Sequence, residues 1–376
     1  MQVTQSRWVA GHGWQGLEAS AATAQLVLVF GASEALAAPG VLDPVRARHP
    51  QAVLAGCSTS GEIAGTRVED GTIVATAVTF ARATVGVART PIASDADSFA
   101  AGHRLASDLQ REGLTHVLVF SDGLAVNGSQ LAAGLAGGLG PQVQVTGGLA
   151  GDGTAFAQTR VVADGAVTSG VAVAVGLYGA GLRVGCASLG GWDPFGPERL
   201  VTRAQGNVLY ELDGQSALTL YRRYLGPHAA GLPASALLFP LAVREPGREA
   251  VVRTVLSVDD RAQSMTFAGD VPEGSHARLM KANVERLIEG ASGAARQSVV
   301  SAEDTAPGLA LLISCVGRKL VLKQRTEEEV EAVRAVVGPA AVLTGFYSYG
   351  ELSPFAAGGR CRLHNQTMTI TTLSEH

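Results

Sequence analysis

A short turn between two glycines carries the densest group of reactive side chains in the sequence. The segment GCSTSGEI (56–63) offers a thiol, three hydroxyls and a carboxylate, from Cys57, Ser58, Thr59, Ser60 and Glu62. Hydroxyls and the N–H groups of a turn can hold a carboxylate or a phosphate, while a side-chain carboxylate can pair with an ammonium group. This combination predicts a site for a small polar ligand such as an amino acid. Alternatively, the glycines allow a tight turn and the hydroxyls satisfy neighbouring backbone groups.

Two later segments repeat the frame of this turn. AVLTGFYSYGEL (341–352) agrees with AVLAGCSTSGEI (52–63) at six of twelve positions, and both place four residues between a glycine and a Gly-Glu pair. VQVTGGLAGDG (143–153) is a weaker copy that ends in Gly-Asp and differs in register by one residue. Related units tend to present equivalent ends to a common axis. We therefore expect the three turns to come together around a shared cleft.

The second copy has glycines in place of hydroxyls. Gly147 and Gly148 would let a ligand approach the backbone closely, because neither residue carries a side chain. Asp152 would either pair with a ligand cation or cap the turn. The second turn is therefore a candidate ligand contact through its backbone.

Aromatic and polar residues gather in and after the third copy. If the chain is extended there, Tyr347 and Tyr349 lie on one side, beside Glu351, and form a pocket wall. Otherwise the rings belong to the core. In LHNQTM (363–368), a strand would place His364 and Gln366 on one face, where they could orient a polar ligand. A lone histidine is also common as a hydrogen-bonded structural residue.

The elements that must position these residues alternate between strands and helices. Each copy follows an apolar run and a helix-like stretch, so each reads as strand, helix, strand and glycine turn. This order predicts an α/β fold of repeated strand-helix-strand units with mixed sheets. The clearest helix covers 326–338, where Thr326 and Glu329 have the spacing of a capping box. Apolar spacing predicts further helices at 276–291 and 215–226, and hairpins are expected at 66–80, 159–175 and 200–214.

Composition narrows the class of protein. Of 376 residues, 47% are apolar and 16% charged, and the formal net charge is −4, so we expect no nucleic acid partner. The four cysteines, Cys57, Cys186, Cys315 and Cys361, form no CxxC pair, which argues against a zinc site and a disulfide framework. The N-terminus lacks the pattern of a leader, and no apolar run is long enough to span a bilayer as a helix. We therefore expect a cytoplasmic protein without membrane insertion.

Several motifs, taken in order, resemble the FIST domains of bacterial proteins. They are GCSTSGEI (56–63), GGLAGDG (147–153), LVTRAQGNVLYELDGQSALTLYRRYLG (200–226), GFYSYGEL (345–352) and LHNQTMTITTL (363–373). The resemblance implies an N-terminal FIST domain over 25–198 and a C-terminal one over 199–375, packed around a shared cleft. It also implies a sensor of small ligands in signal transduction, whose output a separate protein would read.

Two other functions stay open at this point. Some haem proteins that sense nitric oxide resemble the same family, and His364, or else His228 or His116, would then supply the axial ligand. Without haem, no cofactor is expected. A hydrolase or transferase would need Cys57 as nucleophile and His364 as its base. However, GCSTSG lacks the second glycine of a nucleophile elbow, and no glycine run has the form of a P-loop.

Overall fold

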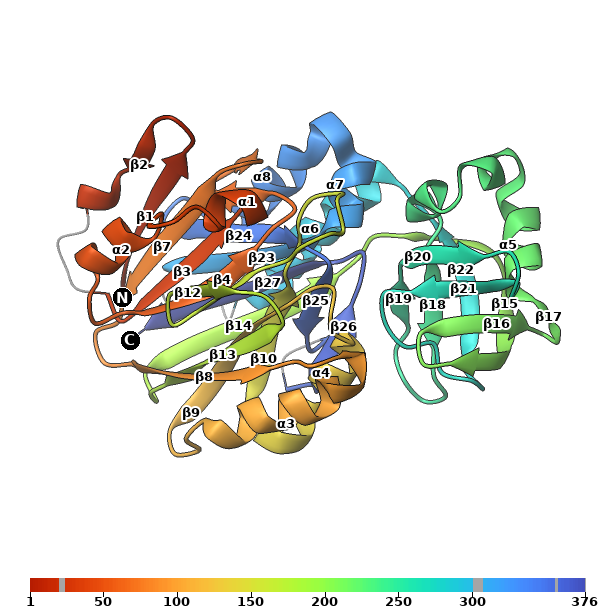
Figure 1. The fold of residues 1–376 in the computed structure, drawn as a ribbon, viewed down its shortest axis with the longest axis horizontal. Coiled ribbons are helices and arrows are strands. Elements are labelled where there is room, and N and C mark those ends of the chain that lie inside the picture. Colours follow the sequence, from red (N-terminus) through yellow and green to blue (C-terminus); the bar gives the residue numbers. More distant parts are fainter. Residues whose placement is uncertain (20–23, 300–306, 356–357, 376) are drawn as a thin grey trace.

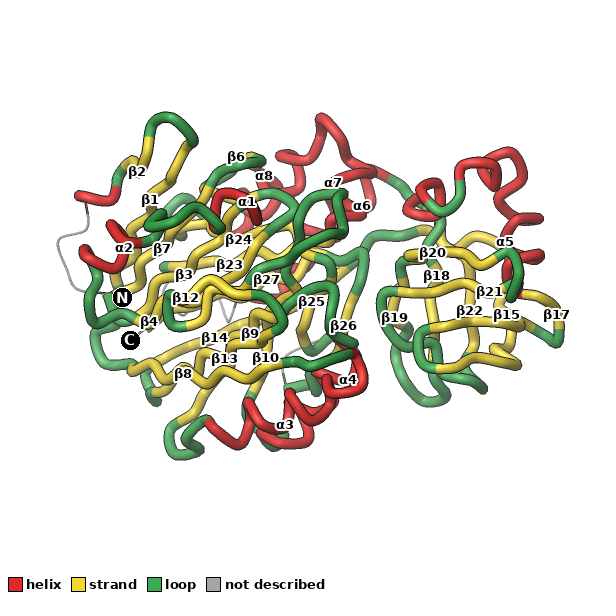
Figure 2. Tube along the Cα trace, in the orientation of Figure 1, coloured by secondary structure: helices red, strands yellow, loops and turns green. Residues whose placement is uncertain are grey.

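The computed structural model describes residues 1–19, 24–299, 307–355 and 358–375. A large core contains three mixed sheets, and a smaller domain made mainly of strands lies beside it (Figures 1 and 2). The two ends of the chain meet in the core, where the Met1 amino group lies 3.6 Å from a carboxylate oxygen of Glu375.

Three structural units, each built around one copy of the glycine turn, form the core. The first unit (2–79) contains β1 (Gln2–Val9), β2 (Gly13–Gln15), η1 (Leu17–Ala19), β3 (Leu26–Gly31), α1 (Ser33–Leu36), α2 (Asp43–Arg48), β4 (Val53–Ser58), β5 (Glu62–Ala64), β6 (Arg67–Glu69) and β7 (Ile73–Thr79). The second unit (84–178) contains β8 (Thr84–Pro91), η2 (Asp95–Asp97), α3 (Ser98–Asp108), β9 (Leu114–Ser121), α4 (Gly128–Leu139), β10 (Gln144–Leu149), β11 (Val161–Ala163), β12 (Ala166–Thr168) and β13 (Val171–Tyr178).

The third unit is interrupted by the smaller domain. It begins with β14 (Leu182–Leu189) and resumes with α6 (Val284–Ser298), β23 (Leu309–Cys315), α7 (Val316–Leu322), η5 (Lys323–Arg325), α8 (Thr326–Val337), β24 (Val342–Ser348), β25 (Gly350–Ser353), β26 (Arg362–His364) and β27 (Met368–Glu375). The inserted domain contains β15 (Asp193–Gln205), β16 (Val208–Leu212), β17 (Gln215–Ser216), α5 (Ala217–Leu225), η3 (Gly226–Gly231), η4 (Ala234–Leu238), β18 (Leu241–Arg244), β19 (Val251–Arg253), β20 (Val255–Asp259), β21 (Ser264–Phe267) and β22 (His276–Lys281). The predicted boundary between residues 198 and 199 falls inside β15, and it stays a prediction.

The three core sheets share one strand order and exchange hairpins. They run β12-β11-β4-β3-β7-β1-β2, β26-β25-β10-β9-β13-β8 and β6-β5-β24-β23-β27-β14. In each, a parallel pair (β3 with β4, β9 with β10, β23 with β24) is followed by an antiparallel strand. The strand after each glycine turn joins another unit, because β5 pairs with β24, β11 with β4 and β25 with β10. The repeat thus produces the predicted α/β fold with mixed sheets.

The inserted domain has its own apolar core. Its long strand β15 pairs with β22 through its first part and with β16 through its second part. Buried side chains from α5 and the strands fill the interior, among them Tyr221, Met265 and Phe267. The predicted hairpin at 200–214 and helix at 215–226 are confirmed as β15–β16 and α5.

One hairpin prediction and two helix predictions are wrong. The hairpin expected over 66–80 is absent, because β6 pairs with β5 whereas β7 pairs with β1 and β3. The helix expected over 276–291 starts only at Val284, capped by the side chain of Asn283, because His276–Lys281 pairs as β22 with both β15 and β18. The capping box is also absent: the Thr326 hydroxyl donates to the carbonyl oxygen of Lys323, and Glu329 is buried against Arg318. In each case tertiary contacts decide the outcome over local propensity.

Candidate functional site

The glycine that opens each turn is required by close packing of the parallel strands. Gly56, Gly147 and Gly345 occupy equivalent places in β4, β10 and β24. A Cβ atom on them would lie 1.8, 1.9 and 1.8 Å from a carbonyl oxygen of the neighbouring strand. Because such distances are far inside van der Waals contact, these glycines have a packing role. Gly148 is similar, since a Cβ there would be 2.8 Å from Ile313.

The three turns come together at the centre of the core, as the repeat predicted. Backbone bonds join the first and third turns between Ser60 and Tyr347 (2.8 Å) and between Tyr347 and Gly61 (2.9 Å). The first and second turns are joined by the Ser58 hydroxyl, which donates to the Gly151 carbonyl oxygen at 2.7 Å. Tyr349 N–H donates to the Leu149 carbonyl oxygen at 3.2 Å and joins the third turn to the second.

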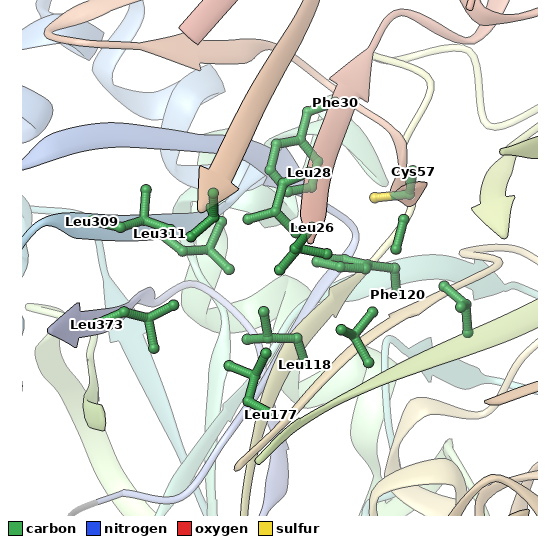
Figure 3. Packing of buried hydrophobic residues seen from close by; sticks show 14 of the residues in the cluster. Leu26, Leu28, Phe30, Cys57, Leu118, Phe120, Leu177, Leu309, Leu311 and Leu373 are labelled. Atoms are coloured by element: carbon green, nitrogen blue, oxygen red, sulfur yellow. The ribbon is translucent and has the colours of Figure 1, made fainter. Parts of the chain in front are cut away.

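Apolar side chains fill the space beneath these turns. Phe346 stacks on Phe30 with ring centroids 4.7 Å apart, and Phe30 meets Phe120 edge to face at 5.4 Å. Figure 3 shows Phe30, Phe120 and Cys57 within this packed cluster. Burial holds the pKa of the Cys57 thiol well above its usual range. The centre is therefore a closed core, with no open cleft between the turns in the described residues, and a ligand could bind only at its edge.

The two turn glutamates have matching, fully buried environments. Glu62 accepts hydrogen bonds from the hydroxyl of Thr59 and from both N–H and hydroxyl of Thr72, at 3.0 and 2.8 Å from the latter. Glu351 accepts from the Ser348 hydroxyl at 2.7 Å and from the N–H and hydroxyl of Thr367 at 3.2 and 2.8 Å. Burial raises the pKa of Glu62 to about 7 and that of Glu351 to about 8. Both carboxyl groups tie a turn to the loop before the next strand.

Tyr347 and Tyr349 do not form one wall. The chain breaks its extended course between β24 and β25, so alternation fails at Tyr349. The Tyr347 hydroxyl donates to Glu329 at 2.7 Å inside the core. Tyr349 instead donates to Asp152 and stacks on Phe156, with centroids 4.5 Å apart. Asp152 also caps its own turn, accepting from backbone N–H groups that include those of Ala157 and Gln158 at 2.8 and 2.7 Å.

His364 and Gln366 do not share a face either. The ring nitrogen Nε2 of His364 lies 3.0 Å from the Ser353 carbonyl oxygen, and burial lowers the pKa of this histidine to about 3. Gln366 adopts a positive φ of 62° after β26 has ended, which destroys the expected alternation. Its Nε2 donates to the Thr254 hydroxyl oxygen of the inserted domain at 2.9 Å.

A cavity of about 800 Å³ opens where the inserted domain meets the core. All three neighbouring parts supply apolar walls: the second unit gives Leu124 and Phe156, the third gives Val316 and Leu320, and the inserted domain gives Leu232 and Leu256. Leu124, Phe156 and Leu256 are 40%, 49% and 44% exposed, which is unusual for large apolar side chains that line one hollow. Such a gathering is typical of a binding surface.

A few polar groups interrupt these walls. Thr254 accepts from Gln366 and keeps its own hydroxyl proton for another acceptor. Asn207 donates through Nδ2 to the Phe267 carbonyl oxygen at 2.8 Å, which leaves Oδ1 as an acceptor. Burial, and then the Glu351 charge, raise the pKa of the Cys315 thiol to about 12, so this group is a neutral thiol. Asp95 is the one carboxylate among the described lining residues.

The expected site residues divide sharply around this cavity. Tyr349 lines it, and Gln366 lies behind its wall through the bond to Thr254. Cys57, the three hydroxyls that follow it and Glu62 are buried in the turns and line neither this cavity nor the other large one, near Arg253. Phe156, Leu124 and Leu256 went unrecognised in the sequence, because only the placement of the inserted domain brings them together.

Haem ligation by a histidine does not fit the described lining. His364, His228 and His116 are absent from the walls of both large cavities. His116 is fully buried with its Nε2 2.8 Å from the Thr146 hydroxyl, and His364 faces the Ser353 carbonyl group. A nucleophilic role for Cys57 lacks a base in the same way, because no hydrogen bond joins it to His364 in the described residues.

No helix in the described residues is long and apolar enough to cross a membrane. The groups of acidic residues, histidines and cysteines in the same part of the chain also include none arranged to hold a metal ion.

Two domains of one known family match most of the chain. The FIST N domain matches residues 25–215, and the FIST C domain matches residues 217–354. The protein belongs to the FIST family. FIST domains are sensor domains of signal transduction, and both domains of this family lie in one chain here.

One protein of similar sequence and one solved structure are only distantly similar to this FIST protein. The uncharacterized protein MJ1623 of Methanocaldococcus jannaschii is 26% identical over 204 residues, which is 50% of this chain and 38% of that protein. The chain therefore matches well under half the length of that relative. A crystal structure of cyanuric acid hydrolase from A. caulinodans aligns over 100% of this chain and 99% of its own, with 9% identity and a TM-score of 0.36. A TM-score of this size says nothing about function.

Proposed function

We propose that this FIST protein is a sensor whose small ligand binds in the cavity between the core and the inserted domain. The observation that carries the proposal is the cavity of about 800 Å³, lined by three separate parts of the chain and by three exposed large apolar side chains. Pockets for small molecules are concave, mostly apolar and often lie between domains, with volumes of about 300–1,000 Å³. The cavity therefore meets the criteria of a ligand site.

The lining favours a ligand with an apolar or aromatic body and one small polar end. Phe156, stacked on Tyr349, and the leucines offer the apolar contact area. The Thr254 hydroxyl and Asn207 Oδ1 offer one donor and one acceptor at the wall of the inserted domain. An amino acid with an apolar side chain brings only its α-ammonium and α-carboxylate charges, whereas a metabolite with further charges would bury more unpaired charge, which is costly.

Signalling would follow from the position of the inserted domain. Asp270 of this domain accepts from the side chains of Asn127 and Gln130, at the start of α4, at 2.8 and 2.7 Å, and these bonds help to hold the junction. A ligand that touches both sides would favour the closed arrangement, since binding shifts a population toward the state it contacts best. A separate output protein would read that position.

Thermal unfolding and calorimetric titration of the whole chain test this proposal. The probes are L-phenylalanine, L-tryptophan and L-leucine, with L-glutamate as the charged comparison. A ligand at 100 times its dissociation constant should stabilise the fold by about 2.7 kcal/mol. Leu256→Arg should abolish this stabilisation by placing a charge in the cavity. Leu200→Arg is the matched control, because Leu200 is similarly exposed, at 40%, and is absent from the lining.

Two results would contradict the proposal. One is that none of the apolar amino acids stabilises the protein while L-glutamate does. The other is that Leu256→Arg and Leu200→Arg respond alike to the ligand. A Soret band after haem titration that survives Leu256→Arg would instead indicate a haem site elsewhere in the molecule.

A further inference from the structure

We infer that a second cavity, which Asp270 itself lines, binds a small anion that carries a carboxylate or phosphate group. The cavity has a volume of about 910 Å³ and lies between α4, the strands β18 and β19 of the inserted domain, and residues 358–363 of the third unit. Its lining includes the arginines Arg248, Arg253, Arg360 and Arg362. This anion site is separate from the apolar cavity, so either proposed site can be disproved without the other.

Arg253 is the central observation. Its side chain is almost fully buried, with the residue 4% exposed, yet no carboxylate lies within salt-bridge distance in the described residues. Its hydrogen bonds go to the carbonyl oxygens of Asp270 and Leu363, both at 3.0 Å, and more weakly to that of Val252 at 3.4 Å. The Nη2 atom has no acceptor among the described residues. A buried guanidinium without a directly paired carboxylate is unfavourable, and an anion in the cavity would relieve it.

Two of the three acidic residues of this cavity, Glu245 and Asp270, are already engaged, whereas the Glu249 carboxylate forms no salt bridge in the described residues. Glu245 is shared by Arg248 and Arg362, at 3.0 and 2.7 Å. The Asp270 carboxylate accepts from the amide groups of Asn127 and Gln130, as described above. Arg360, which is exposed, forms no salt bridge in the described residues. The four guanidinium groups therefore outnumber the three carboxylates of Glu245, Glu249 and Asp270, and Arg253 and Arg360 form no salt bridge in the described residues.

The placement of these arginines indicates how an anion would be held. Arg253 reaches the cavity from β19 of the inserted domain, whereas Arg360 and Arg362 approach from the third unit. Guanidinium groups present a planar fork of donors that matches two oxygens of a carboxylate or phosphate. An anion held by both sides would thus bridge the inserted domain and the core. Planar matching also predicts that lysine at position 253 replaces arginine poorly.

The experiment is calorimetric titration of the whole chain with sodium phosphate and, separately, with sodium citrate at low ionic strength. We expect saturable binding of at least one anion, and the stronger of the two identifies the preferred group. Binding should weaken as NaCl is added, because salt screens charges near the surface. Arg253→Met should weaken the binding by about tenfold or more, since charge-assisted hydrogen bonds are the strong ones. Arg253→Lys should fall between Arg253→Met and the parent protein.

Two further variants keep the test decisive. Arg203→Met is the matched control, because Arg203 lies in the same inserted domain, is paired with Glu211 at 2.8 Å and does not line the cavity. If Arg253→Met does not fold, Arg360→Met at an exposed position takes its place and should weaken binding by about threefold or more. The inference is overturned if the parent protein binds neither anion. It is also overturned if Arg203→Met loses binding as much as the cavity variants do, or if Arg360→Met and the foldable Arg253 variants bind as tightly as the parent.

Discussion

Several residues of the repeated turns have structural roles, although their side-chain chemistry suggested ligand binding. Glu62 and Glu351 looked like ligand contacts in the sequence, but each accepts three hydrogen bonds from Thr and Ser residues of its own turn and the following loop. The sequence did single out these two positions, because both glutamates follow a glycine at matching places in the repeated turns. It could not tell a ligand from an internal partner, since Thr72 and Thr367 follow their glutamates by 10 and 16 residues and no pattern pairs them.

The raised pKa of Glu351 predicts a pH dependence of stability. Burial moves this pKa from 4.5 to about 8, and Arg318 partly opposes the shift. A group whose pKa is raised on folding binds more protons in the native state, so its contribution is complete below pH 4.5 and is lost as pH rises through 8. Glu62, with a pKa of about 7 and the Asp70 charge nearby, acts in the same direction. The contribution of these two carboxyl groups to the free energy of unfolding should therefore decline between pH 5 and pH 8.

Glu351→Gln isolates this effect. The amide keeps the shape of the protonated acid and cannot ionise, so the decline between pH 5 and pH 8 should become shallower than in the parent protein. Urea denaturation at unit steps of pH measures it. Buried His364 and His116, with pKa values lowered to about 3, destabilise the fold as pH falls below about 6.5, so they oppose the two glutamates below that pH and leave the glutamate effect clearest between pH 6.5 and pH 8. An unchanged slope in Glu351→Gln would assign the pH dependence to other groups.

The strand glycines give a second prediction at this scale. Gly345→Ala should destabilise the protein by about 4 kcal/mol or more, because its Cβ would lie 1.8 Å from the Leu312 carbonyl oxygen and the two strands would have to separate. Gly137→Ala in α4 is the control: nothing lies within 4 Å of a Cβ there, and alanine should stabilise this helix by about 0.5–1 kcal/mol. Chemical denaturation compares both variants, and similar small effects would show that the strand spacing adapts.

At the scale of elements, the sequence predicted helices and strands correctly where the local pattern and the tertiary contacts favour the same structure. The strand-helix-strand order, α5 and the hairpin at the start of the inserted domain followed from periodicity and turn residues. The exchange of β5, β11 and β25 between units could not be foreseen, because short strands carry no signal for their partner. Glu329 failed as a capping residue for a related reason: Arg318, in another helix, offers it a stronger partner.

The Arg318–Glu329 pair is the clearest test of element packing. Arg318 of α7 donates to Glu329 of α8 at 2.6 Å and to the Leu287 carbonyl oxygen of α6 at 2.7 Å, with both charged side chains fully buried. Removing one partner should cost roughly 3–5 kcal/mol, because the other charge stays buried and unpaired. We expect Glu329→Gln and Arg318→Met each to show this loss, and the double variant to lose less than the sum. Denaturation of the four proteins measures the coupling, and additive losses would contradict it.

At the scale of the whole molecule, the candidate sites lie where the inserted domain meets the core. The sequence indicated that repeated units would bring their turns together, and they do so, but the meeting point is filled by Phe30, Phe120 and Phe346. The cavities instead form beside α4, at a junction whose partners are over a hundred residues apart in sequence. No periodicity or motif encodes such a junction, and only the folded chain reveals it.

This junction yields the last prediction. Asp270→Ala removes the acceptor of two hydrogen bonds from α4, so the inserted domain should move more freely against the core. Amide hydrogen exchange in the first turn of α4 and near residue 270 should accelerate roughly tenfold, because bonds to a charged group contribute about 1.5–3 kcal/mol each. Exchange in the buried strands β9 and β23 should stay unchanged. Asp260→Ala, which removes an exposed partner of Arg222, provides the control. Because the ligand of the apolar cavity is proposed to bridge this junction, Asp270→Ala should also weaken its binding, and a loosened junction that binds it as tightly as before would separate ligand binding from domain position.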